Sequence, residues 1–204
     1  MKLNETKVKI CGLFRPCDAG FVNRAMPNYA GFVFYEKSRR HVSAAQARAL
    51  RQVIHPSICT VGVFVNASAD EIIQLYREGV ISVVQLHGNE DDNFIARLRE
   101  TLPKATIWKA FTIRTSADLD VTAASQADMV LLDNGSGTGE RFDWSMIGSF
   151  SRPFILAGGL TAKIIPEAID CLHPYAVDIS SGVESGGVKD EGLILAAVKA
   201  ARGR

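Results

Sequence analysis

The chain has 204 residues, which is enough to bury a substantial core and is consistent with one domain or two small ones. Its 23 basic and 22 acidic residues are well mixed, so no basic stripe indicates nucleic-acid binding and no polybasic segment indicates a membrane anchor. The polar start is unlike a signal peptide, no apolar run reaches the length of a membrane span, and the four cysteines are scattered. We therefore expect a cytoplasmic protein without disulfides.

Short apolar segments recur along the chain at similar intervals. They cover residues 8–11, 29–35, 59–65, 82–87, 106–111, 129–133, 153–158 and 175–180. Most are continuously apolar and rich in Val, Ile and Phe, as strands buried on both faces usually are. We therefore predict eight buried strands.

Helical patterns lie between these segments. They are clearest at 44–54, 69–79, 91–102 and 192–202, and weaker at 17–27 and 145–150. Ser43 with Gln46, and Ser68 with Glu71, have the spacing of a capping box at the start of a helix.

Strands that alternate with helices predict a parallel sheet joined by right-handed crossovers. Eight such units in about 200 residues match a (β/α)8 barrel at its minimal size. A doubly wound open sheet, which usually has five or six strands, is the alternative. No linker or low-complexity segment interrupts the pattern, so we predict a single α/β domain over 1–204, a (β/α)8 TIM barrel with parallel strands.

Polar residues and glycines gather where the predicted strands end, and the strand starts show nothing comparable. These ends are Cys11-Gly12, residues 36–40, Asn66, His87-Gly88, Asp133-Asn134, residues 157–159 and residues 178–182. Barrel enzymes build their active sites at the carboxyl ends of the strands. The asymmetry therefore predicts a catalytic mouth.

The last two strand ends are rich in glycine and have few side chains that could bind a ligand. Gly158 and Gly159 follow the seventh strand, while Ser180, Ser181 and Gly182 follow the eighth. Backbone N–H groups beside helix starts bind phosphate, and barrels often place a phosphate between these two loops. We predict a phosphate site here, although glycines that only make tight turns would look the same.

The glycine-rich segment 135–139, after the sixth strand, lacks the spacing of a dinucleotide fingerprint, and the chain has no P-loop. We interpret this segment as a flexible lid over the mouth.

Cys11 and Asp133 end the first and sixth strands, so both side chains can point into the same mouth. A thiol and a carboxyl group there could divide the roles of base and acid. A cysteine on an apolar strand can equally be a core residue, and the residues alone leave both interpretations open.

Seven segments resemble the phosphoribosylanthranilate isomerase family, and they occur in that family's order. They are KICG, GFVFYEKSRRHVS, VGVFVN, VQLHGNE, LLDNGSGTGERFDW, FILAGGL and VDISSGVE, and they run from the first predicted strand to the eighth. The helices and residues 13–28 match only loosely.

The resemblance implies a (β/α)8 barrel without cofactor or metal that performs an Amadori rearrangement in tryptophan biosynthesis. It implies that Asp133 is the general acid, that Cys11 is the general base, and that Arg40 holds the anthranilate end of the substrate. It also implies that Asp178 contacts a substrate hydroxyl. We expect a phosphosugar-anthranilate substrate, no nucleic-acid or membrane partner, and a monomer or homodimer.

Other phosphosugar barrels are the nearest alternatives. A pentose-phosphate epimerase would need several metal-ligating residues, and only His87 is available for that role. An indole-glycerol-phosphate synthase would need more strand-end lysines than Lys109. The sugar isomerase of histidine biosynthesis has an aspartate in place of Cys11. A non-catalytic phosphosugar-binding barrel, or one subunit of a complex, would not need the Cys11–Asp133 pair. His87 is expected to hydrogen-bond its neighbours rather than to act as a base.

Overall fold

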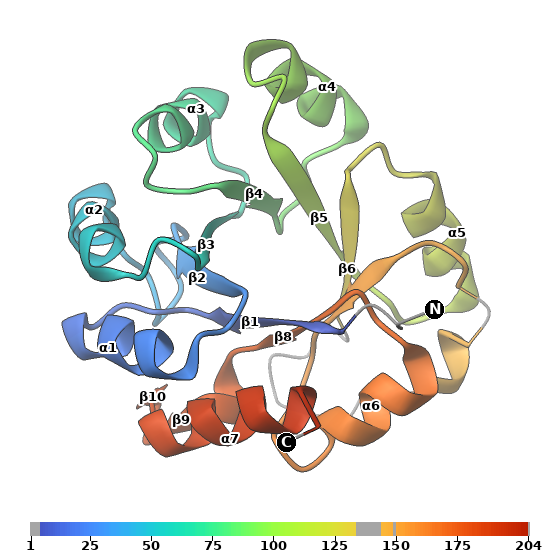
Figure 1. The fold of residues 1–204 in the computed structure, drawn as a ribbon. Coiled ribbons are helices and arrows are strands. Elements are labelled where there is room, and N and C mark those ends of the chain that lie inside the picture. Colours follow the sequence, from blue (N-terminus) through green and yellow to red (C-terminus); the bar gives the residue numbers. More distant parts are fainter. Residues whose placement is uncertain (1–4, 134–143, 149, 204) are drawn as a thin grey trace.

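A computed structural model describes residues 5–133, 144–148 and 150–203 (Figure 1). Eight parallel strands close into a barrel, in which each strand pairs with the next and the eighth pairs with the first. The strands are β1 (Lys7–Cys11), β2 (Tyr29–Val33), β3 (Cys59–Phe64), β4 (Val83–Leu86), β5 (Thr106–Thr112), β6 (Met129–Asp133), β7 (Phe154–Leu156) and β8 (Ala176–Ile179). The predicted barrel is confirmed, and the open sheet is wrong.

Helices surround the barrel (Figure 1). They are α1 (Pro16–Ala25), α2 (Ala44–Val53), α3 (Ala69–Arg77), α4 (Asp92–Thr101), α5 (Ser116–Ala124), α6 (Ile165–Leu172) and α7 (Glu191–Ala201). The capping box at Ser43 and Gln46 forms in both directions, whereas at Ser68 only the serine accepts a bond, from the backbone N–H of Glu71. Among the described residues, no helix is long and apolar enough to cross a membrane.

The structure differs from the sequence predictions at several places, and α5 and α6 are helices for which no pattern was singled out. The predicted helix at 145–150 is wrong, because the described part of that segment holds only a single 3₁₀ turn, η1 (Trp144–Met146). A hairpin of β9 (Glu184–Ser185) and β10 (Val188–Lys189) follows β8 and was not predicted. Its two-residue turn is Gly186-Gly187, with φ of +59° and +82°, which suits the left-handed turns of tight hairpins. The predicted lid at 135–139 lies outside the described residues.

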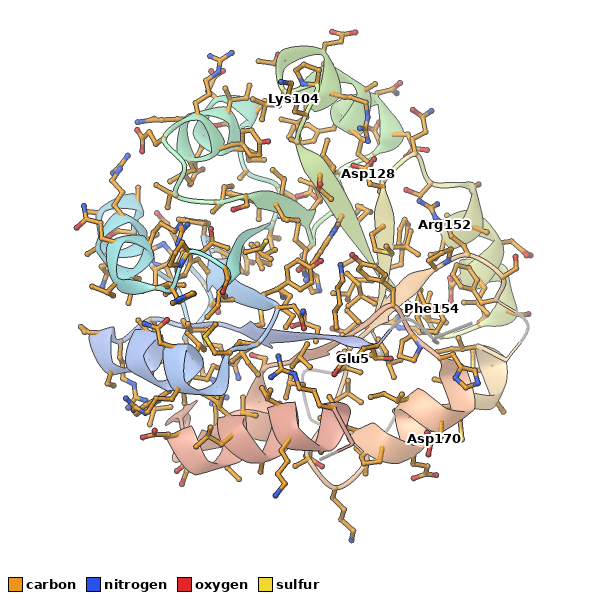
Figure 2. All side chains as sticks on the ribbon, in the orientation of Figure 1. Glu5, Lys104, Asp128, Arg152, Phe154 and Asp170 are labelled. Atoms are coloured by element: carbon orange, nitrogen blue, oxygen red, sulfur yellow. The ribbon has the colours of Figure 1, made fainter. Side chains whose placement is uncertain are left out.

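Side chains alternate across each strand and so form two apolar cores. On β1, Val8 and Ile10 join the large cluster between strands and helices, while Lys9 and Cys11 lie on the opposite, inward face. The inner core is smaller, and Figure 2 shows side chains in both spaces. Its buried members are Tyr29, Val61, Val83, Trp108, Ala110, Leu131, Ile155, Ala157 and Ala176. Because the barrel is packed in this way, the polar inward positions at the carboxyl ends of the strands form the floor of a site.

Candidate active site

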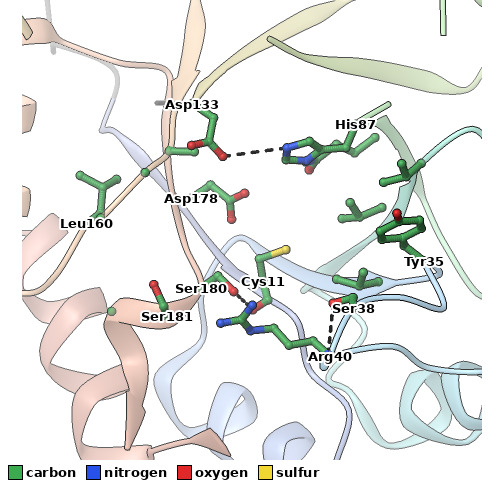
Figure 3. Close-up of a pocket in the computed structure, with 18 residues that line it drawn as sticks. Cys11, Tyr35, Ser38, Arg40, His87, Asp133, Leu160, Asp178, Ser180 and Ser181 are labelled. Carbon is green, nitrogen blue, oxygen red and sulfur yellow. Dashed lines mark hydrogen bonds and ion pairs between the residues drawn. The ribbon is translucent and has the colours of Figure 1, made fainter. Parts of the chain in front are cut away.

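A cavity of about 280 Å³ opens at the carboxyl ends of the strands (Figure 3). All nine residues that the sequence assigned to catalysis or substrate binding line it. They are Cys11, Arg40, Asp133, Gly158, Gly159, Asp178, Ser180, Ser181 and Gly182. Figure 3 shows the Cys11 thiol and the carboxylates of Asp133 and Asp178 directed into the same space.

Glycines on both sides of Cys11 make room for the site. A Cβ at Gly31, on β2, would lie 2.9 Å from the Cys11 sulfur, so the thiol occupies the space that a side chain there would fill. Gly12 has φ of +82°, and a Cβ on it would collide with the side chain of Arg40. Glycine after Cys11 therefore allows the left-handed turn and lets Arg40 pass close to the backbone.

The thiol of Cys11 lies in a charged environment although it ends an apolar strand. Burial raises the pKa of Cys11, and the nearby Asp178 carboxylate also raises it, while Lys9 and Lys189 act in the opposite direction. The thiol is therefore mainly protonated near neutral pH, and its thiolate fraction increases as the pH rises.

Asp178 lies on β8 beside Lys9 of β1. Its Oδ2 accepts a 2.7 Å hydrogen bond from the Lys9 Nζ inside the barrel. Its Oδ1 is buried and has no partner among the described residues. An unpaired buried carboxylate oxygen is costly, so its position on the cavity wall suits a donor from a ligand, such as a hydroxyl group.

His87, at the end of β4, faces Asp133 across the cavity (Figure 3). The His87 Nε2 lies 3.9 Å from the Asp133 Oδ2, and its Nδ1 lies 3.1 Å from the amide nitrogen of Gln85. Partial burial lowers the pKa of His87 despite the opposing Asp133 carboxylate. The imidazole is therefore largely neutral at pH 7, and the pair with Asp133 is not a full ion pair. His87 bonds its neighbour Gln85, as predicted, and it also lines the cavity.

Glu184 on β9 gathers three cationic side chains at the edge of the cavity. It accepts hydrogen bonds from Arg40 Nε (2.6 Å) and Nη2 (2.9 Å), from Arg39 Nη2 (2.7 Å) and from Lys189 Nζ (2.7 Å). Burial alone would raise the pKa of Glu184, but the bonds from Arg40 and Lys189 outweigh it and lower the pKa. Sequence reasoning did not assign Glu184 a role, although the residue ends the matched segment VDISSGVE.

Arg40 lines the cavity, whereas Arg39 does not. The Arg40 side chain is 19% exposed and that of Arg39 is 59% exposed. Glu184 takes the Nε and Nη2 edge of the Arg40 guanidinium, and within the described part of the chain Nη1 donates to no acceptor. The Nη1 and Nη2 edge therefore remains available for a second carboxylate.

The glycine-rich loops after β7 and β8 lie in direct contact. Gly182 packs so closely on the Leu160 carbonyl that a Cβ at Gly182 would overlap it. Gly158 and Gly159 have φ of +89° and +64°. Across residues 158–159 and 181–182, the backbone N–H groups donate to no acceptor in the described portion of the structure. Residues 158–159 and 181–182 line the cavity, and an anion bound against this backbone would satisfy such donors.

Comparisons with known proteins agree over almost the whole chain. A sequence model of the family described as N-(5'-phosphoribosyl)anthranilate (PRA) isomerase matches residues 8–200. The isomerase of that name from Endomicrobium trichonymphae is 44% identical over 201 residues, which cover 96% of this chain and 98% of the relative. The one from Caldanaerobacter subterraneus subsp. tengcongensis is 38% identical over 204 residues, with 97% and 98% covered.

Solved structures give the same result. The crystal structure of phosphoribosyl anthranilate isomerase from Thermotoga maritima has a TM-score of 0.88 at 34% identity, covering 98% of this chain and 100% of the other. A structure of phosphoribosyl anthranilate isomerase in complex with reduced 1-(o-carboxyphenylamino)-1-deoxyribulose 5-phosphate has a TM-score of 0.86 at 34% identity, with the same coverage. With a closed barrel, matched motifs and full-length relatives, this chain belongs to the N-(5'-phosphoribosyl)anthranilate isomerase family of enzymes.

Proposed function

We propose that the chain converts N-(5'-phosphoribosyl)anthranilate into 1-(2-carboxyphenylamino)-1-deoxyribulose 5-phosphate, with Cys11 as general base and Asp133 as general acid. The observation that carries the proposal is that a thiol, two carboxylates, a guanidinium and two glycine-rich loops, whose N–H groups have no acceptor among the described residues, come together around one cavity. The substrate has groups that match each of them, namely an acidic C–H, hydroxyls, a carboxylate and a phosphate.

The reaction begins with two proton transfers, one from Asp133 and one to Cys11, which line the same cavity. Asp133 gives a proton to the furanose ring oxygen, the C1′–O bond breaks, and a protonated Schiff base forms. The iminium acidifies the C2′ hydrogen, and the Cys11 thiolate removes it to give an enolamine. The enolamine gains a proton at C1′ and loses the C2′ hydroxyl proton, so the aminoketose is an isomer of the substrate. Asp178 Oδ1 accepts a hydrogen bond from a substrate hydroxyl.

The direct test is a fluorescence assay, because the anthranilate substrate emits and its consumption can be followed. Purified protein is mixed with freshly prepared N-(5'-phosphoribosyl)anthranilate, and the product is identified by mass spectrometry and by its retention time. We expect enzyme-dependent loss of fluorescence. Tight binding of the substrate without turnover would favour the non-catalytic phosphosugar-binding barrel instead.

Arg40→Lys should weaken binding of the anthranilate end. Lysine keeps the charge but has no second edge, so it cannot hold Glu184 and the substrate carboxylate together. We expect KM to rise about tenfold, because a charge-assisted hydrogen bond contributes about 1.5–3 kcal/mol. Steady-state kinetics checks this, with Arg39→Lys as the matched control, because Arg39 shares Glu184 but does not line the cavity. Equal KM values for Arg40→Lys and the parent would show that the guanidinium does not bind the substrate.

Gly159→Val should weaken substrate binding and inhibition by inorganic phosphate together. A branched side chain would keep the phosphate away from the N–H groups, and losing one or two such bonds reduces affinity about tenfold or more. Gly186→Val is the matched control, because Gly186 also has positive φ (+59°), a Cβ there meets nothing within 4 Å, and it does not line the cavity. If both variants lose affinity equally, backbone strain rather than phosphate contact is the cause.

A further inference from the structure

Lys9 is a charged residue at the centre of the barrel, beneath the cavity floor. Its side chain is 0% exposed, and it lies two positions before Cys11 on β1, so both face inward. The β1–β8 register places Lys9 directly beside Asp178, and their side chains meet at 2.7 Å. Lys9 is not one of the residues that line the cavity, so it touches the site only through its neighbours.

Packing alone does not account for a lysine at this place. Inward positions of such barrels are usually filled by Val, Ile or Leu. Removing an ammonium and a carboxylate from water costs several kcal/mol for each ion, and an apolar pair of similar volume is often as stable or more stable. The buried pair of Lys9 and Asp178 therefore points to a role in the site above it.

The Lys9 side chain also lies beside the thiol. A Cβ built on Gly31 would be 2.9 Å from the Cys11 sulfur and 3.3 Å from the Lys9 Cε. Both side chains therefore pack around the same point of β2, where no side chain separates them. The ammonium bonds Asp178, and the end of the same side chain packs near the thiol.

The charges around Cys11 come from several elements. Lys9 on β1 and Lys189 on β10 are positive, and Asp178 on β8 is negative. Arg40 passes over Gly12 beside the thiol, while His87 and Asp133 lie across the cavity. Burial alone would lower the pKa of Lys9, but Asp178 and Cys11 outweigh it and raise the pKa, so Lys9 stays charged.

We propose that Lys9 is a positioning residue whose buried ammonium holds the Asp178 carboxylate in place and supplies the positive charge that the Cys11 thiolate faces. This inference rests on the proposed function only in assigning the thiolate a use in catalysis. The effect of Lys9 on the ionisation of Cys11 can be measured without turnover, because a thiolate reacts with iodoacetamide and a thiol does not.

Lys9→Met should make the Cys11 thiolate harder to form. We expect alkylation of Cys11 by iodoacetamide at pH 8 to slow about tenfold, because an opposite charge within about 4–6 Å strongly favours the ionised form. Mass spectrometry of the peptide that contains Cys11 separates its alkylation from that of the exposed Cys17, Cys59 and Cys171. In a plot of kcat/KM against pH, the rise that follows ionisation of Cys11 should shift to higher pH in Lys9→Met. A merely structural defect would instead lower kcat/KM at every pH.

Lys109→Met is the matched control. Lys109 on β5 is also a buried lysine (6% exposed), but its ammonium donates to the Gly88 carbonyl at 2.7 Å and pairs with Glu90 at 3.5 Å rather than with Asp178. This variant should leave the pH dependence of Cys11 alkylation unchanged.

Asp178→Asn provides a second test in the opposite direction, which remains available if Lys9→Met does not fold. Removing the negative charge beside Lys9 should speed Cys11 alkylation at pH 8, because Asp178 opposes the thiolate that Lys9 favours. The proposal is overturned if folded Lys9→Met alkylates like the parent, or if Asp178→Asn slows the reaction. Failure of the proposed function would instead be seen as turnover that survives in Cys11→Ala, while Cys11 alkylation in Lys9→Met and Asp178→Asn still changes as expected.

Discussion

Cys11→Ala is expected to lower kcat by roughly 10² to 10⁴, the usual contribution of a positioned general base. The alanine has no atom that can take the C2′ proton, while the cavity, Arg40 and the glycine-rich loops stay as they are. Product binding should therefore change little. Single-turnover and steady-state fluorescence assays measure the first effect, and a product titration measures the second.

Cys59→Ala is the matched control for this variant, because it is the same substitution at an exposed cysteine that begins β3, at the opposite end of the barrel. A Cys11→Ala enzyme that kept a third of the parent's turnover would show that Cys11 is not the base.

The pH dependence of kcat/KM has a predicted direction. Because burial raises the pKa of Cys11, kcat/KM should increase as the pH rises from neutral, since the thiolate is the reacting form.

Asp133→Asn should abolish detectable turnover with the fold intact. The amide has nearly the shape of the carboxyl group but cannot deliver a proton to the ring oxygen, so the furanose does not open. The assay is again the loss of substrate fluorescence, and circular dichroism with thermal melting checks the fold. Asp120→Asn, an exposed position on α5, is the control for the substitution itself.

The comparison with Asp178→Asn decides between the two carboxylates of the cavity. If Asp133 is the acid, Asp178→Asn should mainly weaken substrate binding, because Asp178 offers its Oδ1 to a hydroxyl and shares its Oδ2 with Lys9. An active Asp133→Asn enzyme beside an inactive Asp178→Asn enzyme would show that the two aspartates have the reverse roles.

The cationic cluster around Glu184 joins the site to the hairpin after β8. Lys189 Nζ bonds Glu184 and also the Ser180 carbonyl at 2.9 Å, while the Ser180 hydroxyl donates to the Cys11 carbonyl at 3.1 Å. The glutamate therefore orients Arg40 and, through Lys189 and Ser180, is linked to the backbone of Cys11. A movement of the hairpin would therefore affect both the Arg40 guanidinium and the backbone of Cys11.

From its amino-acid sequence alone, the chain is predicted to have eight strands, most of its helices and the barrel, with Cys11 and Asp133 at strand ends, but no helix is predicted at α5 or α6. The period of two along a strand puts Lys9 and Cys11 on one face, and a strand end puts Asp133 at the mouth, because both features depend only on neighbouring residues. The helix predicted at 145–150 is absent from the described part of that segment, because a short and weak helical pattern does not by itself stabilise a helix.

Which of these side chains meet depends on how the strands are arranged in space. Lys9 and Asp178 are 169 residues apart, and Arg40 and Glu184 are 144 apart. Closure of the barrel makes β1 and β8 neighbours, and the β9–β10 hairpin brings Glu184 to Arg40. A local sequence pattern shows on which face of its strand a residue lies, but it does not show which residue of a distant strand it will contact. Lys9 lies on the same strand as Cys11, but the Asp178 carboxylate that pairs with it reaches it only because the barrel closes.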